Sequence, residues 1–166
     1  MVYYVYSKGT TKNRKGLISM NIKKYDLVLE ETKDSYFFDG RASLSSEISV
    51  NSFARALGIH LKPEEVVMLI CVNGQNKPIA VSQISHGTTN SSMLPMDNLF
   101  KRILLSGGVK FFLVHNHPSE SLEPSQADIT VTRRIVEASK LLGIEFLDHV
   151  IVTRNSSTSL RGLGYL

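Results

Sequence analysis

The pattern of hydrophobic and polar positions changes character near residue 46. Before that point, short stretches rich in Tyr, Val, Ile and Phe alternate with Lys, Gly, Thr and Asn, which is typical of β-strands joined by turns. A serine-rich patch at residues 43–52 marks a boundary. The pattern therefore predicts a β-rich N-terminal extension, residues 1–46, and a main domain, residues 47–166. The strands expected in the extension span residues 2–6, 17–30 and 35–39.

Helical and extended patterns alternate in the main domain. After the boundary, the apolar residues Ile48, Phe53 and Leu57 recur with a helical period, and Gly58 ends the segment. The later apolar runs are continuous and bounded by turn residues, which is typical of strands covered on both faces. This order predicts an α/β (α+β) fold with a central mixed sheet. The expected elements are helix 47–59, strand 65–72, strand 78–84, helix 95–106, strand 109–115, helix 125–142 and strand 144–153.

Length and composition narrow the classes of protein. A chain of 166 residues with 42% hydrophobic and 20% charged residues forms one domain, or one domain with a small extension. The only cysteine, Cys71, excludes a disulfide scaffold and a cysteine-based zinc finger. The longest apolar run, residues 66–72, is too short to cross a bilayer, and the N-terminus does not read as a signal peptide. We therefore expect a cytoplasmic protein with no membrane association.

The charge of the chain is mildly basic. A net charge of +4 and a pI near 9.2 are compatible with an acidic partner such as nucleic acid but do not require one. The densest basic stretch, residues 8–15, is interpreted as a solvated hairpin tip rather than a phosphate contact. Nucleic acid is thus a weakly supported partner.

Two histidines and one carboxylate form the most informative pattern. His115 and His117 stand two residues apart at the end of a predicted strand, so their side chains point to the same side. Asp128 follows in the first turn of the next predicted helix. A nitrogen and oxygen set of this kind suits zinc, and three protein ligands leave a fourth position open for a water of lowered pKa. The sequence therefore predicts one zinc ion held by His115, His117 and Asp128.

Ser125 precedes Asp128 by three residues and admits two interpretations. Its hydroxyl could donate to the bound water or to a developing oxyanion. Ser-x-x-Asp at a helix start is also a capping box, in which the side chains satisfy free backbone N–H groups. The sequence leaves both roles open.

The last predicted strand contains the dipeptide Asp148-His149. Metal ligands usually form hydrogen bonds to outer groups, so this pair could support the site. A structural histidine on a strand is the favoured interpretation.

The segment around the histidines resembles a known family. The order His-x-His, seven residues, Ser, two residues, Asp is the metal motif of the JAMM (JAB/MPN) metalloprotease superfamily. The neighbouring His-Asn-His-Pro-Ser at 115–119 and Leu-Asp-His-Val-Ile at 147–151 are similar to its bacterial RadC branch, and the likeness extends over residues 47–153. It implies a JAB fold, a curved mixed sheet flanked by helices, with one zinc ion.

The resemblance also implies a general base, a glutamate from an upstream strand. Glu65 stands at the matching place, and its neighbour Glu64 is the alternative. Because side chains alternate along a strand, only one of the two faces the site, and Glu65 is favoured. In the implied reaction Glu65 moves a proton from water to the leaving amine, and Ser125 stabilises the oxyanion. The implied substrate is a peptide or protein cleaved at a peptide or isopeptide bond.

The chain departs from the RadC-like pattern at three places. Glu120 replaces the usual Gly, which adds a Cβ where the loop prefers positive φ and a carboxylate that could reach the metal. Met96-Asp97 replaces the usual Arg-Glu after Pro95. Residues 1–46 do not match the helix-hairpin-helix segment of full-length RadC-type proteins, which weakens a carried-over DNA role.

Two alternatives to the zinc hydrolase remain at this stage. One is a DNA-associated RadC-type protein with a repair or nuclease-like role, although phosphodiester chemistry often uses two metals held by several carboxylates. The other is a binding module that keeps the JAB fold without turnover. Chelation would abolish hydrolysis but spare simple binding, and steep salt dependence would indicate DNA binding.

Overall fold

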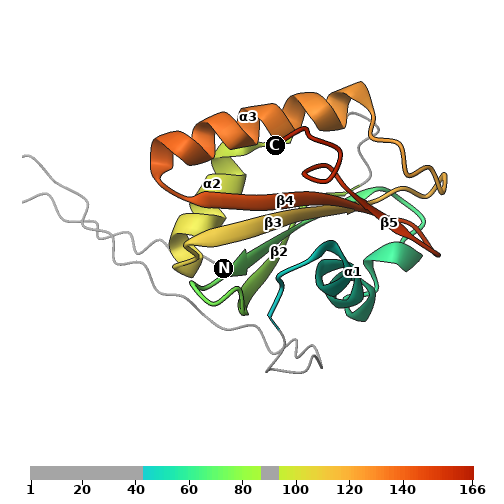
Figure 1. Cartoon of the computed structure of the whole chain (residues 1–166), viewed down its shortest axis with the longest axis horizontal. Coiled ribbons are helices and arrows are strands. Elements are labelled where there is room, and N and C mark those ends of the chain that lie inside the picture. Colours follow the sequence, from blue (N-terminus) through green and yellow to red (C-terminus); the bar gives the residue numbers. More distant parts are fainter. Residues whose placement is uncertain (1–42, 87–93) are drawn as a thin grey trace, which may run out of the picture. The chain divides into compact units, whose positions relative to one another are not determined.

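A mixed five-stranded sheet forms the centre of the domain (Figure 1). The computed structural model describes residues 43–86 and 94–166. The strand order is β2-β1-β3-β4-β5; β3 and β4 are parallel and the other neighbours are antiparallel. The predicted mixed sheet flanked by helices is therefore confirmed. The elements are α1 (Glu47–Ala56), the 3₁₀ helix η1 (Ile59–Leu61), β1 (Val66–Val72), β2 (Pro78–His86), α2 (Met96–Ser106), β3 (Lys110–Asn116), α3 (Gln126–Leu142), β4 (Glu145–Val152) and β5 (Ser157–Ser159).

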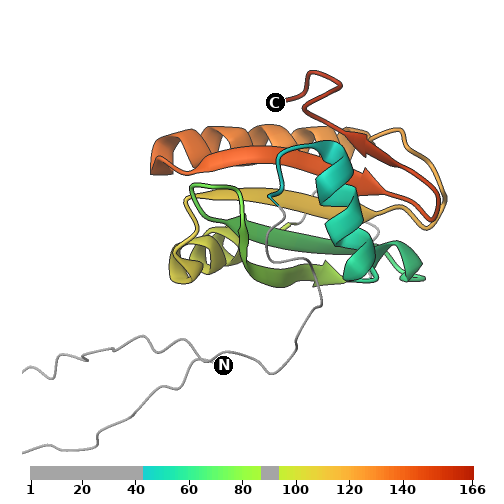
Figure 2. The same ribbon diagram turned by 60° about the horizontal axis from the view of Figure 1, so that its bottom comes forward.

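The helices cover both faces of the sheet. Figures 1 and 2 show α1 on one face and α3 on the opposite face. Apolar residues of α2 and α3 share one core cluster, so α2 lies on the same side as α3. Helix α3 forms the connection between the parallel strands β3 and β4, as parallel pairing requires. This crossover begins at the end of β3 and enters α3, where the predicted metal ligands lie.

Burial of both sheet faces explains the continuous apolar runs. In β1, Val67 and Leu69 pack in the cluster shared with α2 and α3. The alternating residues Ile70 and Val72 pack in the cluster that contains apolar residues of α1. Since successive side chains of a strand point to opposite faces, a strand between two helical layers needs apolar residues at every position.

The first helix differs in detail from its prediction. Ile48 is 78% exposed, and the buried apolar stripe consists instead of Val50, Phe53 and Ala54. This stripe has the i, i+3, i+4 spacing of a single helix face. Helix α1 ends before Gly58, which adopts a φ of 71° that few other residues tolerate. Ile59 therefore belongs to the separate helix η1.

Of two short features of the sheet, the sequence predicts one: the Asn73-Gly74 pair indicates the hairpin turn between the first two strands, whereas strand β5 escaped prediction. The β1–β2 connection turns at Asn76, which has a φ of 58°, while the side chain of Asn73 accepts hydrogen bonds from the N–H groups of Gln75 and Lys77. The strand β5 is polar and only three residues long, and its antiparallel hydrogen bonding to β4 is what defines it as a strand. It has no apolar period that a sequence pattern could reveal.

Some predictions fall outside the described residues. These are the three strands of the extension, the basic stretch 8–15 and most of the loop predicted between residues 84 and 95. The division at residue 46 stays a prediction for the same reason. Within residues 43–86 and 94–166, none of the helices combines the length and the apolar character needed to cross a membrane.

Candidate metal centre

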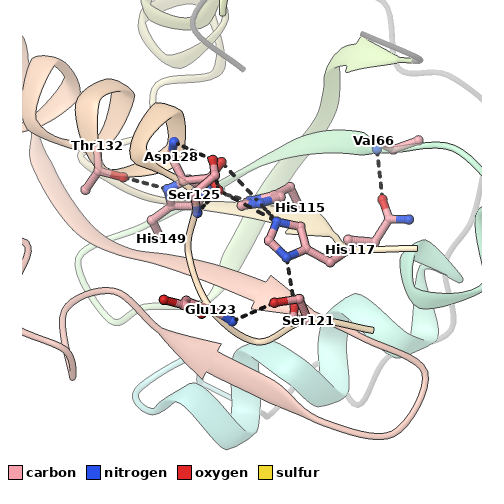
Figure 3. Close-up of polar contacts among 10 residues, drawn as sticks. Val66, His115, His117, Ser121, Glu123, Ser125, Asp128, Thr132 and His149 are labelled. Carbon is pink, nitrogen blue, oxygen red and sulfur yellow. Dashed lines mark hydrogen bonds and ion pairs between the residues drawn. The ribbon is translucent and has the colours of Figure 1, made fainter. Parts of the chain in front are cut away.

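Three potential ligands meet where β3 ends and α3 begins. His115 is the penultimate residue of β3, His117 follows the strand, and Asp128 lies in the first turn of α3. The Nε2 atoms of the two histidines are 2.9 Å apart. Asp128 Oδ1 lies 3.4 Å from His115 Nε2, and Asp128 Oδ2 lies 3.7 Å from His117 Nε2. Figure 3 shows the three side chains pointing toward one another.

The start of α3 holds the carboxylate in place. Ser125 is the N-cap of the helix, and its hydroxyl accepts a hydrogen bond from Asp128 N at 3.1 Å. In return, Ser125 N and Ser125 Oγ donate to Asp128 Oδ2 at 2.8 and 2.6 Å. This reciprocal capping box fixes the carboxylate while one oxygen, Oδ1, still faces His115.

Each histidine is oriented by its second ring nitrogen. His117 Nδ1 donates to the carbonyl oxygen of Ser121 at 2.8 Å. His115 Nδ1 lies 2.8 Å from His149 Nε2. Because both Nδ1 atoms are engaged on the outside, both Nε2 atoms face the carboxylate. Such outer contacts are the ordinary means by which proteins orient metal-binding imidazoles.

Burial and charge set the ionisation of the cluster. Burial lowers the pKa of His115 to about 4, so this ring is neutral at pH 7. Burial would lower the pKa of His117 as well, but Asp128, the Ser121 carbonyl and Glu65 raise it above its ordinary value. Burial opposes ionisation of Asp128, yet the ion pair with His117 and the hydrogen bonds from Ser125 hold its pKa well below its usual range. The carboxylate is therefore charged and placed to attract a cation.

Ser125 satisfies the capping interpretation in this structure. Its hydroxyl hydrogen is directed to Asp128 Oδ2, and its oxygen accepts from Asp128 N. To donate to an oxyanion, the hydroxyl would have to turn away from the carboxylate. That second role stays a prediction.

The two candidate bases differ in their surroundings. Glu65 is partly buried directly before β1, whereas Glu64 is exposed. Burial and the charge of Asp128 raise the pKa of Glu65, and the charge of His117 lowers it. These interactions place the Glu65 carboxylate within electrostatic reach of the cluster. A raised pKa suits a group that must take up and return a proton near neutral pH.

Asn116 is a site residue that sequence reasoning missed. This side chain, between the two histidines, is 1% exposed. Its Oδ1 accepts a hydrogen bond from Val66 N at 2.8 Å, and its Nδ2 donates to the carbonyls of Lys62 and Glu64 at 3.1 and 3.0 Å. Asn116 thereby ties the backbone on both sides of Glu65 to the end of β3. A buried polar residue between two ligands was the available signal.

Asn116→Ala should lower the free energy of unfolding by about 2–4 kcal/mol, because it removes three hydrogen bonds and leaves the Val66 N–H unpaired. Urea denaturation followed by circular dichroism measures this loss. The exposed Asn155→Ala is the matched control, with an expected change within about 0.5 kcal/mol. Equal urea midpoints for the two variants would show that the hydrogen bonds of Asn116 do not stabilise the fold.

Glu120 stands where RadC-like sequences usually have Gly, and its φ is positive, 62°, as that replacement leads one to expect. Its carboxylate accepts a hydrogen bond from Arg154 N at 3.1 Å, and Arg154 Nε lies 3.9 Å away. The side chain therefore binds the turn between β4 and β5. The expectation that it could offer a carboxylate to the metal does not match this arrangement. A glycine would supply the same backbone conformation without the contact.

The side chains of Asp148 and His149 form contacts with different parts of the molecule. Asp148 Oδ1 accepts from the backbone N–H groups of His149 and Arg161, and its Oδ2 accepts from the Ser159 hydroxyl. The carboxylate thus secures the C-terminal turn. The His149 ring instead contacts His115 on one side and Thr132 on the other. The favoured interpretation, a histidine with only a structural role on its strand, missed this link to a ligand.

Comparison with known proteins agrees with the geometry. A family model for the RadC-like JAB domain matches residues 44–165. A UPF0758 protein of Methanospirillum hungatei is 41% identical over 105 residues, which cover 63% of this chain and 47% of that protein. A UPF0758 protein of Thiobacillus denitrificans is 39% identical over 125 residues, or 75% of this chain and 55% of that protein. A UPF0758 protein of Finegoldia magna is 44% identical over 92 residues, which cover 55% of this chain and 41% of that protein.

The relatives carry no named activity, because UPF0758 is a name without a stated function. The chain spans about half the length of the curated relatives it matches. What these longer proteins do as a whole is therefore open. The feature of this chain that bears on function is the cluster at the end of β3.

Proposed function

Since this chain belongs to the family of RadC-like JAB domains, a family that includes hydrolases, we propose that it is a zinc-dependent hydrolase that cleaves a peptide or isopeptide amide bond. The observation that carries the proposal is the convergence of two imidazole Nε2 atoms and one carboxylate on a single point. This is the one group of metal-ligand type found among residues 43–86 and 94–166.

The polarity of the cluster supports a bound cation. His117 Nδ1 faces a carbonyl oxygen, which only accepts, so Nδ1 carries a hydrogen, and a ring that gives up its other proton to bind a metal has its lone pair on Nε2. That lone pair points toward His115 Nε2 and toward the Asp128 carboxylate, whose oxygens also only accept. A metal cation in place of the Nε2 proton would satisfy these acceptors together.

The spacing of the cluster fits zinc. Tetrahedral zinc with bonds of about 2.0–2.1 Å separates neighbouring ligand atoms by about 3.3 Å. The separations here are 2.9, 3.4 and 3.7 Å. Two histidines and a carboxylate are also a known catalytic zinc set, with one position left for water or substrate. His115, His117 and Asp128 would hold the ion, and small side-chain movements suffice.

The surrounding residues support hydrolysis in particular. When bound, zinc supplies Lewis acidity and makes water a nucleophile near neutral pH. Glu65 would take the proton of the attacking water and return it to the leaving amine nitrogen, as its raised pKa favours. Ser125, whose hydroxyl contacts the Asp128 carboxylate, would donate its hydroxyl hydrogen to the developing oxyanion. The partner implied by this chemistry is a peptide or protein substrate.

Metal content and cleavage test the proposal together. The purified chain should contain about one zinc per molecule by plasma mass spectrometry. Zinc-loaded protein is then incubated with two probe sets, linear peptides and peptides joined through a lysine ε-amine, and products are identified by mass spectrometry. Cleavage that phenanthroline stops and added zinc restores is expected. A chain that takes up no zinc would overturn the proposal, and a loaded chain that cleaves neither set would point to a binding module.

A further inference from the structure

His149 lies behind the candidate metal centre and takes no part in the proposed reaction. It is 1% exposed on β4, and its Nε2 lies 2.8 Å from His115 Nδ1. Its other nitrogen, Nδ1, lies 2.7 Å from the hydroxyl of Thr132, which is fully buried. Thr132 follows Asp128 by one turn of α3, so the same helix face supplies a ligand and the end of this line (Figure 3).

The line Thr132–His149–His115 allows two arrangements of hydrogens. In the first, the Thr132 hydroxyl donates to His149 Nδ1 and His149 Nε2 donates to His115 Nδ1. A neutral His115 then carries its hydrogen on Nε2 and cannot bind a metal there. In the second, His115 Nδ1 donates to His149 Nε2, and His149 Nδ1 donates to Thr132 Oγ1. Only the second arrangement leaves a lone pair on His115 Nε2 beside Asp128.

The surroundings of His149 exclude a simpler outcome, a protonated ring with two donors. The ring is buried, and the adjacent carboxylate of Asp148 is occupied by backbone N–H groups and the Ser159 hydroxyl rather than by the imidazole. A buried charge without a partner is costly, so His149 is neutral and has one donor and one acceptor. The Thr132 hydroxyl can accept the hydrogen of His149 Nδ1, so it provides the partner that the second arrangement requires.

We propose that His149 and Thr132 are positioning residues that stabilise the Nε2-binding form of His115. In the zinc-bound protein, Thr132 Oγ1 accepts from His149 Nδ1, and His149 Nε2 accepts from His115 Nδ1. This inference rests on the zinc site of the proposed function. It extends the site to two side chains that do not touch the ion, and it explains why a second histidine is buried beside the first.

Matched substitutions on α3 test the proposal. Thr132→Val keeps the shape and removes the acceptor, so zinc affinity should fall about 10–100-fold in competition with a chromophoric chelator. Thr132→Ser restores the hydroxyl and should bind within about threefold of wild type. Thr130→Val is the same change on the exposed side of the helix, where the hydroxyl meets only the Gln126 carbonyl, and should bind like wild type. Equal affinities of the Thr132→Val and Thr130→Val proteins would overturn the proposal.

A measurement on the wild-type protein covers the case in which Thr132→Val fails to fold. Long-range ¹⁵N–¹H NMR of the zinc-loaded chain should show hydrogens on the Nδ1 atoms of His115 and His149 and none on His149 Nε2. A hydrogen on His149 Nε2 would overturn the inference. A wild-type chain that binds no zinc would overturn the proposed function as well. A chain that binds zinc, shows the expected NMR pattern and cleaves nothing would support this inference and overturn only the hydrolase.

Discussion

Asp128→Asn is expected to reduce zinc in the purified protein from about one ion per chain to a trace. The loss of zinc affinity should exceed the roughly 100-fold loss seen when a residue that only hydrogen-bonds to a ligand is replaced. The substitution keeps the size of the side chain and an oxygen that can accept from Ser125 N. It removes the charge that faces both histidines. Two neutral imidazoles alone form an incomplete zinc site. Plasma mass spectrometry and chelator competition measure the change.

Glu120→Gln is the matched control for the loss of a carboxylate. Glu120 lies in the loop that leads into α3, and its side chain binds Arg154 on the turn between β4 and β5. The control should therefore retain wild-type zinc, and circular dichroism should show both variants folded. A zinc content of the Asp128→Asn protein equal to that of the control would show that the carboxylate is not a ligand.

Glu65→Gln should lower kcat/KM about 10²–10⁴-fold on the best-cleaved probe while the zinc content stays at the wild-type level. A glutamine has nearly the same shape but cannot accept a proton at neutral pH. Because Glu65 interacts with the cluster electrostatically and stands beside a backbone held by Asn116, the change leaves the ligands in place. Initial cleavage rates and metal content of the same preparation provide the two readouts.

Glu64→Gln separates the two candidate bases. Glu64 is exposed, and the sequence alone left it as the alternative to Glu65. If Glu65 is the base, Glu64→Gln cleaves at a rate within about threefold of wild type. Loss of cleavage in Glu64→Gln with full cleavage in Glu65→Gln would reverse the assignment. Full cleavage in both would remove a glutamate base from the mechanism.

Several parts of the fold were predictable because they depend on local chemistry. The continuous apolar run before Asn73 is a strand buried on both faces, and Gly58, Gly107 and Gly143 each stand at a helix end with positive φ. Backbone sterics impose the same rule wherever glycine follows a helix. The exposed Ile48 shows the limit of this approach, because several helix faces carried apolar residues and only packing against the sheet selected one.

The ligand set was predictable for a similar reason. The two-residue period of a strand places His115 and His117 on one side, and a helix start places Asp128 in its first turn. The contacts that orient these ligands were not predictable. Asn116 binds residues about 50 positions away, and His149 lies 34 residues from His115. A residue's own sequence neighbours contain no information about such a partner.

The sequence by itself determined the order of the three helices and first four strands, the mixed sheet and the identity of the three potential ligands. Only the tertiary structure decided that Glu65 is partly buried whereas Glu64 is exposed, that Glu120 binds Arg154, and that His149 lies beside His115. Hydrophobic periods depend on composition along one segment, whereas a hydrogen bond depends on the direction and distance between two atoms. Those directions exist only after packing has set the register of β3 against β1 and β4.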